Sequence, residues 1–122
     1  MGIDTTEAAS RVPARFREGV ARLAGDAGLL REMAVMTVPE FAPLVEQSSH
    51  CIAESDLDGA VRALHKLKEM LSTFESDGVV LEIQEVIQAG RSGRGDVTSS
   101  LWEHHRPAIR DLIDEIKTFA GR

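Results

Sequence analysis

The sequence is poor in aromatic residues and in cysteine, and it contains no tyrosine. Its 122 residues include four phenylalanines, one tryptophan and a single cysteine, so no disulfide can form within the chain. A lone thiol is typical of a reducing compartment, and we expect a cytoplasmic protein. No apolar run approaches the roughly 20 residues that would span a bilayer, and no secretory signal is visible, so we expect no membrane partner.

Basic residues are also in short supply. The chain has 14 Lys and Arg against 20 Asp and Glu, which gives a net charge of −6. A protein that binds nucleic acid uses a basic face to contact the phosphates, and the sequence indicates no such face. We therefore expect a protein partner rather than DNA or RNA.

Apolar residues recur at helical spacing along most of the chain, and no segment alternates in the manner of a strand. We expect a lead-in over 1–11 and a single folded domain over 12–122. The first helix should end at Gly25, and Asp26 should cap a second helix that is broken or kinked between Thr37 and Pro43. The remaining predicted elements are a turn and cap at Ser55-Asp56, helices at about 57–74, 78–89 and 97–119, a flexible loop at 90–95, a cap at Asp96 and a bend at Pro107.

Short connections between consecutive amphipathic helices favour antiparallel neighbours. The expected fold is therefore all-α: an up-and-down antiparallel four-helix bundle, with an additional N-terminal helix packing across one end. Trp102 could anchor a partner, but we expect it to be half-buried against a neighbouring helix. Met33, Met36 and Met70 are expected to fill the core.

One titratable residue, His65, lies at the border of the apolar stripe of the third predicted helix. Packing supports such a side chain on one side while solvent reaches it on the other, which suits a nucleophile that must meet a partner. A neutral imidazole has a free lone pair and can attack without a separate base. Lys68, nearly one turn further on, can neutralise charge in phosphoryl transfer. The stripe consists of Leu57, Ala60, Leu64, Leu67, Leu71 and Phe74.

The run His65-Lys66-Leu67-Lys68-Glu69, followed by Phe74, resembles the His-x-Leu-Lys-Gly motif of the histidine-containing phosphotransfer (HPt) domain of bacterial two-component signalling. Segments 16–26 and 54–60 also resemble the family's first segment and the turn before its phosphorylatable helix. The resemblance therefore covers nearly the whole chain.

The resemblance implies a phosphocarrier rather than a conventional enzyme. His65 would accept a phosphoryl group and Lys68 would stabilise it. The partner would be a response-regulator receiver domain, a hybrid histidine kinase or both, with magnesium only on the receiver and no cofactor on this chain. No ATP-binding glycine motif is visible, so we expect no autokinase activity. The sequence does not specify the oligomeric state, the cognate partner or the direction of phosphate flow, and we expect a monomer.

Glu69 departs from the motif, because the family has glycine at that position. The glutamate removes the clearance that glycine provides, and its carboxylate, one turn from His65, would repel a phosphate by on the order of 1 kcal/mol. A repulsion of this size would slow phosphoryl transfer by about tenfold. The alternative is a degenerate, noncatalytic module that docks on a receiver or histidine kinase. Under either hypothesis the binding surface is centred on His65 and includes Asp58, Arg62, Lys66, Lys68, Glu69 and Ser72.

Other polar residues receive simpler interpretations. The adjacent pairs His50-Cys51 and His104-His105 do not converge on one ion along a helix, so we expect no metal site. The loop arginines, Arg91 and Arg94, could contact a phosphate, but we interpret them as part of a solvated turn. A third hypothesis, a plain structural or dimerising bundle, would require an exposed apolar stripe.

Overall fold

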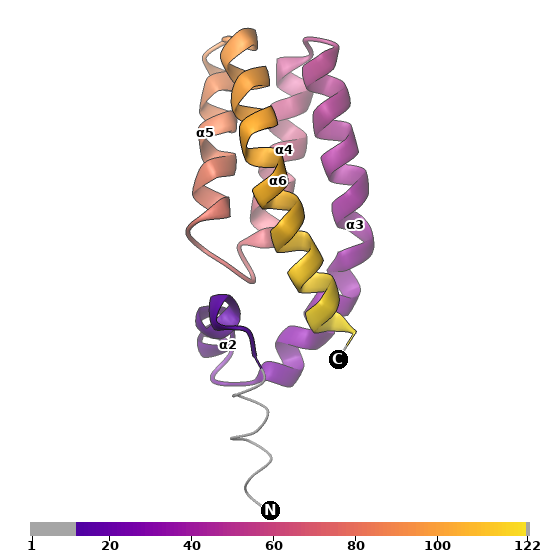
Figure 1. The fold of residues 1–122 in the computed structure, drawn as a ribbon, viewed down its shortest axis with the longest axis vertical. Coiled ribbons are helices and arrows are strands. Elements are labelled where there is room, and N and C mark those ends of the chain that lie inside the picture. Colours follow the sequence, from indigo (N-terminus) through magenta and orange to yellow (C-terminus); the bar gives the residue numbers. More distant parts are fainter. Residues whose placement is uncertain (1–11, 122) are drawn as a thin grey trace, which may run out of the picture.

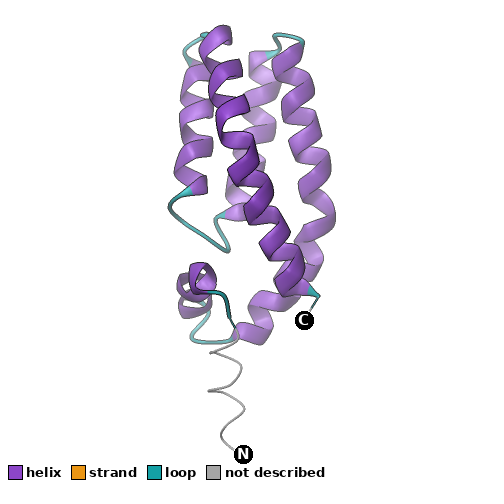
Figure 2. Cartoon of the chain, in the orientation of Figure 1, coloured by secondary structure: helices purple, strands orange, loops and turns teal. Residues whose placement is uncertain are grey.

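A computed structural model describes residues 12–121, and this part of the chain is entirely helices and short connections, without a strand (Figures 1 and 2). The prediction of an all-α fold is confirmed. The predicted lead-in over 1–11 lies outside the described residues. The elements are the 3₁₀ turn η1 (Ala14–Phe16) and the helices α2 (Arg17–Arg22), α3 (Ala27–Ala53), α4 (Leu57–Leu71), α5 (Val79–Arg91) and α6 (Gly95–Ala120).

The four longest helices pack as a closed ring. Helix α3 contacts α4 and α6, and α5 contacts the same two helices. Figure 1 shows these four helices side by side, with α2 below the lower ends of α4 and α5 and next to the lower part of α3. The side of the molecule formed by α4 and α5 therefore lies opposite the side formed by α3 and α6.

The apolar stripe of α4 faces the interior, as predicted. Five of its six members have no exposed surface, and Leu57, in the first turn, is half-buried. Burying one such side chain contributes about 1.5–3 kcal/mol, so the stripe fixes the rotation of α4 about its axis. Trp102 is buried as well, and its Nε1 donates to Ser49 Oγ over 2.9 Å.

Two aspartates cap the central helices, as predicted. Asp26 Oδ1 accepts from the Leu29 amide, and Asp56 Oδ1 accepts from the Gly59 amide, each over 2.9 Å. Such a cap contributes about 0.5–2 kcal/mol. The predicted cap at Asp96 is wrong, because α6 begins at Gly95, two residues earlier than predicted, and Asp96 lies in its first turn. Its carboxylate there faces the positive end of the helix dipole.

The prolines do not interrupt the helices that contain them. Helix α3 runs without interruption through Pro39 and Pro43, so the predicted break did not form, although Figure 1 shows that the helix is bent. Helix α6 is likewise continuous through Pro107. All three prolines are exposed, so water can replace the helical donor that each ring removes.

Helix α5 is longer than the sequence indicated, and the loop after it is shorter. Gly90 and Arg91 belong to the helix, and only residues 92–94 connect it to α6. Gly90 is buried where a Cβ atom would come within 2.8 Å of Val61 Cγ2, so this glycine lets α5 approach α4 closely. The expected burial of Met36 is also wrong, since this side chain is 73% exposed.

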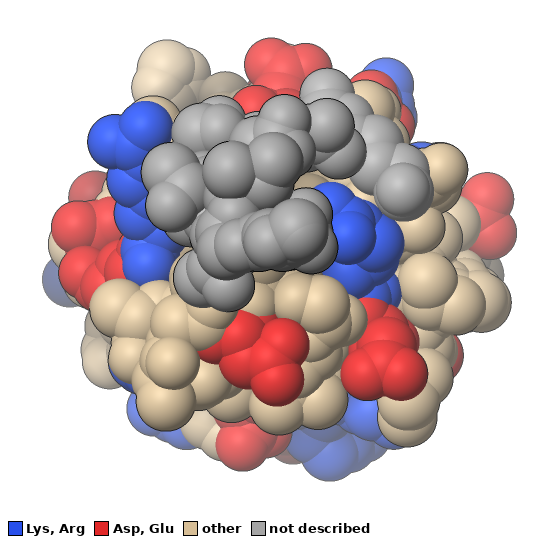
Figure 3. Space-filling view, turned by 90° about the horizontal axis from the view of Figure 1, so that it is seen from below, with Lys and Arg blue, Asp and Glu red and all other residues tan. Residues whose placement is uncertain are grey.

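The N-terminal segment contacts the ends of α4 and α6. The centroid of the Phe16 ring lies 6.0 Å from the centroid of the Phe74 ring and 5.5 Å from that of the Phe119 ring. Beside this cluster, Arg15 pairs with Glu75 over 2.8 Å and also with Glu115. Figure 3 looks onto this end and shows charged groups of both signs interspersed among uncharged residues.

Candidate functional site

His65 projects from the middle of α4 towards solvent, and its side chain is 47% exposed. The neighbouring Leu64 and Leu67 are fully buried and hold this turn of the helix against the core. The imidazole is therefore carried by a rigid element and remains accessible to a partner.

A shallow hollow of about 440 Å³ lies beside the imidazole. It is lined by Val61, Arg62, His65, Lys66 and Glu69 from α4 and by Arg91 from α5. Three of the six residues carry a permanent positive charge, and one carries a carboxylate. The net charge of these lining residues is therefore positive, and it attracts a dianionic group.

The side chain of Glu69 contacts the imidazole of His65. Its Oε1 lies 3.6 Å from His65 Nε2, one turn along α4, and its side chain is 66% exposed. The carboxylate therefore lies on the side of the outer ring nitrogen of the imidazole. Because the glutamate is exposed, rotation about its side-chain bonds can move it into solvent.

Lys68 and Ser72 lie beside the hollow but do not line it. Lys68 Nζ donates to Gln84 Oε1 of α5 over 2.5 Å. Ser72 is the C-cap residue of α4, and its hydroxyl donates to the Lys68 carbonyl over 2.6 Å. Asp58 is exposed in the first turn of α4. Of the expected binding residues, the hollow thus brings only Arg62, Lys66 and Glu69 together with His65.

Sequence reasoning missed the two residues that α5 brings to this region. Gln84 was not singled out, and Arg91 was interpreted as part of a solvated turn. Arg91 reaches the hollow because α5 continues through the buried Gly90 and ends beside α4. A glycine followed by arginine at a predicted helix end was the only signal that could have indicated this contact.

The remaining titratable residues form separate groups. His105 is buried and joins α6 to α5, with Nδ1 at 2.9 Å from a Glu82 oxygen and Nε2 at 2.7 Å from a Glu85 oxygen. Cys51 is buried, and this burial, together with the nearby Asp56, raises the pKa of its thiol. Within residues 12–121, no three His, Cys, Asp or Glu side chains are arranged to hold a metal ion.

None of the helices described in residues 12–121 combines the length and the apolar character needed to cross a membrane. Comparison with known protein families, curated proteins and solved structures found no match for this chain. Any functional interpretation therefore rests on the residues and their geometry.

Proposed function

We propose that this chain is a phosphocarrier of the HPt type, which accepts a phosphoryl group on His65 from a receiver-domain aspartate and passes it to another. The observation that carries the proposal is the half-exposed imidazole of His65 beside a hollow that contains three basic side chains. Nucleophile and counter-charges are what phosphoryl transfer requires of the protein.

The proposal interprets α3 to α6 as the up-and-down antiparallel bundle of such a domain, with α2 across one end. The closed ring of helix contacts supports this interpretation. So do the contacts of Phe16 and Arg22 with the C-terminal end of α4, where Arg22 Nη2 donates to the Ser72 carbonyl over 2.9 Å. In this interpretation the domain extends over 12–122 and works in the bacterial cytoplasm.

The reaction is a simple displacement at phosphorus. A ring nitrogen of neutral His65 attacks the aspartyl phosphate, an N–P bond forms, and the bond between phosphorus and the aspartate oxygen breaks. The aspartate leaves as a carboxylate, and the proton on the other ring nitrogen passes to solvent. Return of the phosphoryl group to a second receiver reverses these steps. The magnesium ion that neutralises the acyl phosphate belongs to the receiver.

The basic residues have distinct proposed roles. Arg62, Lys66 and Arg91 surround the transferred group from the open side of the hollow. Lys68 stabilises the phosphate from the side of α5, where Gln84 fixes its ammonium group. An ammonium group has three donors, so the bond to Gln84 leaves two for phosphate oxygens.

A noncatalytic docking module is the second candidate, and the distance of 3.6 Å between Glu69 Oε1 and His65 Nε2 favours it. A carboxylate at this position stabilises the tautomer whose Nε2 carries the proton, and that nitrogen then has no free lone pair. It also repels an incoming phosphoryl group. The same α4 surface would then bind a receiver or a histidine kinase without accepting phosphate.

Phosphoryl transfer from a panel of phosphorylated receiver domains tests the proposal. The wild-type chain should acquire acid-labile, alkali-stable phosphate, and His65→Gln should not. His104→Gln is the matched control, because His104 is also exposed but lies on α6. Receivers that bind the wild-type chain without transfer, together with transfer to Glu69→Gly, would instead establish the docking module. Retention of transfer in His65→Gln would reject His65 as the acceptor.

A further inference from the structure

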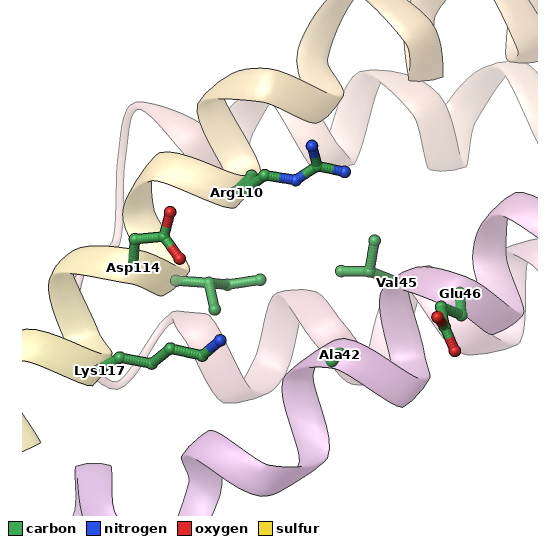
Figure 4. Close-up of a pocket in the computed structure, with 7 residues that line it drawn as sticks. Ala42, Val45, Glu46, Arg110, Asp114 and Lys117 are labelled. Carbon is green, nitrogen blue, oxygen red and sulfur yellow. The ribbon is translucent and has the colours of Figure 1, made fainter.

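A second concave surface lies on the opposite side of the molecule, between α3 and α6. This groove has a volume of about 240 Å³ and an apolar floor of Ala42, Val45 and Ile113. Charged side chains form its rim, namely Glu46 from α3 and Arg110, Asp114 and Lys117 from α6. Figure 4 shows Arg110 and Lys117 extending from α6 towards α3 across the groove.

The apolar surface continues from the groove along the outside of α3. Val35 is 57% exposed and Met36 is 73% exposed. Pro39, Ala42 and Pro43 follow at intervals of three or four residues and are exposed as well. Residues at this spacing share one side of a helix, so they form a stripe beside the groove. A contiguous apolar surface of this kind marks an interaction site.

The charges on the rim are complementary to each other. Glu46 on α3 and Arg110 and Lys117 on α6 are exposed, and among residues 12–121 none of the three belongs to an ion pair. In a two-fold interface every contact occurs twice: if a residue of one copy meets a second residue of the other copy, the same pair also meets with the two copies exchanged. A second copy turned onto this face would bring its Glu46 towards the two cations, and its cations towards Glu46.

We propose that the α3–α6 face joins two copies of this chain in a two-fold symmetric dimer. The apolar stripe and groove form the centre of the interface, and Glu46, Arg110, Asp114 and Lys117 form its polar rim. This proposal replaces the monomer expected from the sequence. Because α4 and α5 lie on the other side of the ring, both His65 hollows remain exposed in the dimer.

The composition of the face favours a second copy over other occupants. An anionic lipid surface would be repelled by Glu46 and Asp114 on the rim. An acidic partner would be attracted by the two cations but repelled by the same carboxylates. A second copy satisfies both signs of charge and covers the apolar stripe at the same time.

Sedimentation velocity of the full chain over a range of concentrations tests the dimer. The wild type should shift from monomer to dimer as concentration rises. Val35→Glu should raise the dissociation constant by at least about tenfold, because it buries an unpaired carboxylate in the interface. Leu81→Glu is the matched control, since Leu81 is 58% exposed but lies on α5. A wild type that stays monomeric at every concentration overturns the proposal, as does equal weakening by both variants.

Charge reversal provides an independent test of the rim. Glu46→Arg should weaken the dimer, because three cations then face one another across each half of the interface. The double variant Arg110→Glu/Lys117→Glu should weaken it for the opposite reason. All three substitutions together should restore association, since the pairing is then reversed but complementary. Failure of the triple variant to recover, with the helical circular dichroism of the wild type, would rule out the proposed rim pairing.

Discussion

The C-terminal end of α4 and its middle, around His65, differ in how their charges are paired. At the C-terminal end, the polar groups of η1 and α2 are paired: Arg15 with Glu75 and Glu115, and Arg22 with Glu18 and the backbone carbonyls of Ser72 and Thr73. Around His65, half a helix away, the three cations that line the hollow form no ion pair within residues 12–121.

The paired groups at the C-terminal end of α4 stabilise the fold, whereas the unpaired charges around His65 are available for binding. The paired charges and the packed aromatic rings at the C-terminal end of α4 already contribute to the fold, so their loss should lower stability. Unpaired charges beside His65 contribute little to folding and stay available to an anionic group from outside. Substitutions in the two regions should therefore change different measured quantities.

The largest expected effect is on stability at the α2 end. Phe16→Ala removes a fully buried ring that contacts Phe74 and Phe119, and it should lower the free energy of unfolding by about 3–5 kcal/mol. Urea denaturation followed by circular dichroism measures this loss. Phosphoryl transfer per folded molecule should remain that of the wild type. A change in transfer beyond the loss of folded protein would contradict the separation.

A smaller loss is expected where α2 crosses the end of α4. A Cβ atom at Gly19 would come within 2.8 Å of the Thr73 carbonyl oxygen, so Gly19→Ala should destabilise by about 1–3 kcal/mol. Gly28→Ala is the control, because its Cβ would meet only the Asp26 side chain, at 3.4 Å. That helical substitution should stabilise by up to about 1 kcal/mol. Equal effects in the two variants would show that the approach of α2 is not tight.

Substitutions in the hollow should change the rate of phosphoryl transfer rather than the stability of the fold. Arg91→Gln removes one of the three cations, and a loss on the order of 1 kcal/mol of attraction should slow phosphoryl transfer by about fivefold to tenfold. Its unfolding free energy should stay within about 0.5 kcal/mol of the wild type. Arg94→Gln, three residues on but outside the hollow, is the control and should leave the rate unchanged. Equal rates for all three proteins would exclude a role for Arg91.

The smallest expected effect concerns acid stability. The hydrogen bond from Ser76, followed by that from Arg22, lowers the pKa of the Glu18 carboxyl below its usual range. A lowered pKa in the folded state stabilises the protein above the carboxyl's unfolded pKa, and this contribution is lost as pH falls through the folded pKa. Glu18→Gln should therefore lose slightly less stability than the wild type on acidification. Urea midpoints measured from about pH 7 to pH 3 test this, with Glu40→Gln as the exposed control.

Local features of this fold could be predicted from the sequence, and contacts between helices could not. The caps at Asp26 and Asp56 and the buried stripe of α4 depend on residues within a few positions, so spacing indicated them. The path of α3 through Pro39 could not be predicted in this way, because it depends on whether the proline faces water or the core. Pro39 faces solvent, and α3 therefore continues through it.

The candidate site shows the same division. The position of His65 at the edge of an amphipathic stripe followed from α4 alone. Gln84 and Arg91 come from α5, and their approach depends on Gly90 packing closely against Val61. The contacts of His105 with Glu82 and Glu85 also join two helices. No pattern within one helix specifies which residues of the next helix it will meet.

The two prolines of α3 give this helix a local weakness that can be followed by amide hydrogen exchange. Pro39 and Pro43 have no amide hydrogen, so the carbonyl oxygens of Val35 and Pro39 lack their usual donors. Amides in this segment should exchange faster than those of the uninterrupted α4. The segment also carries the exposed apolar stripe, so association through it should slow exchange there first. Amide exchange in the unmodified chain thus reports association at a stretch of helix whose hydrogen bonding is already incomplete in the single chain.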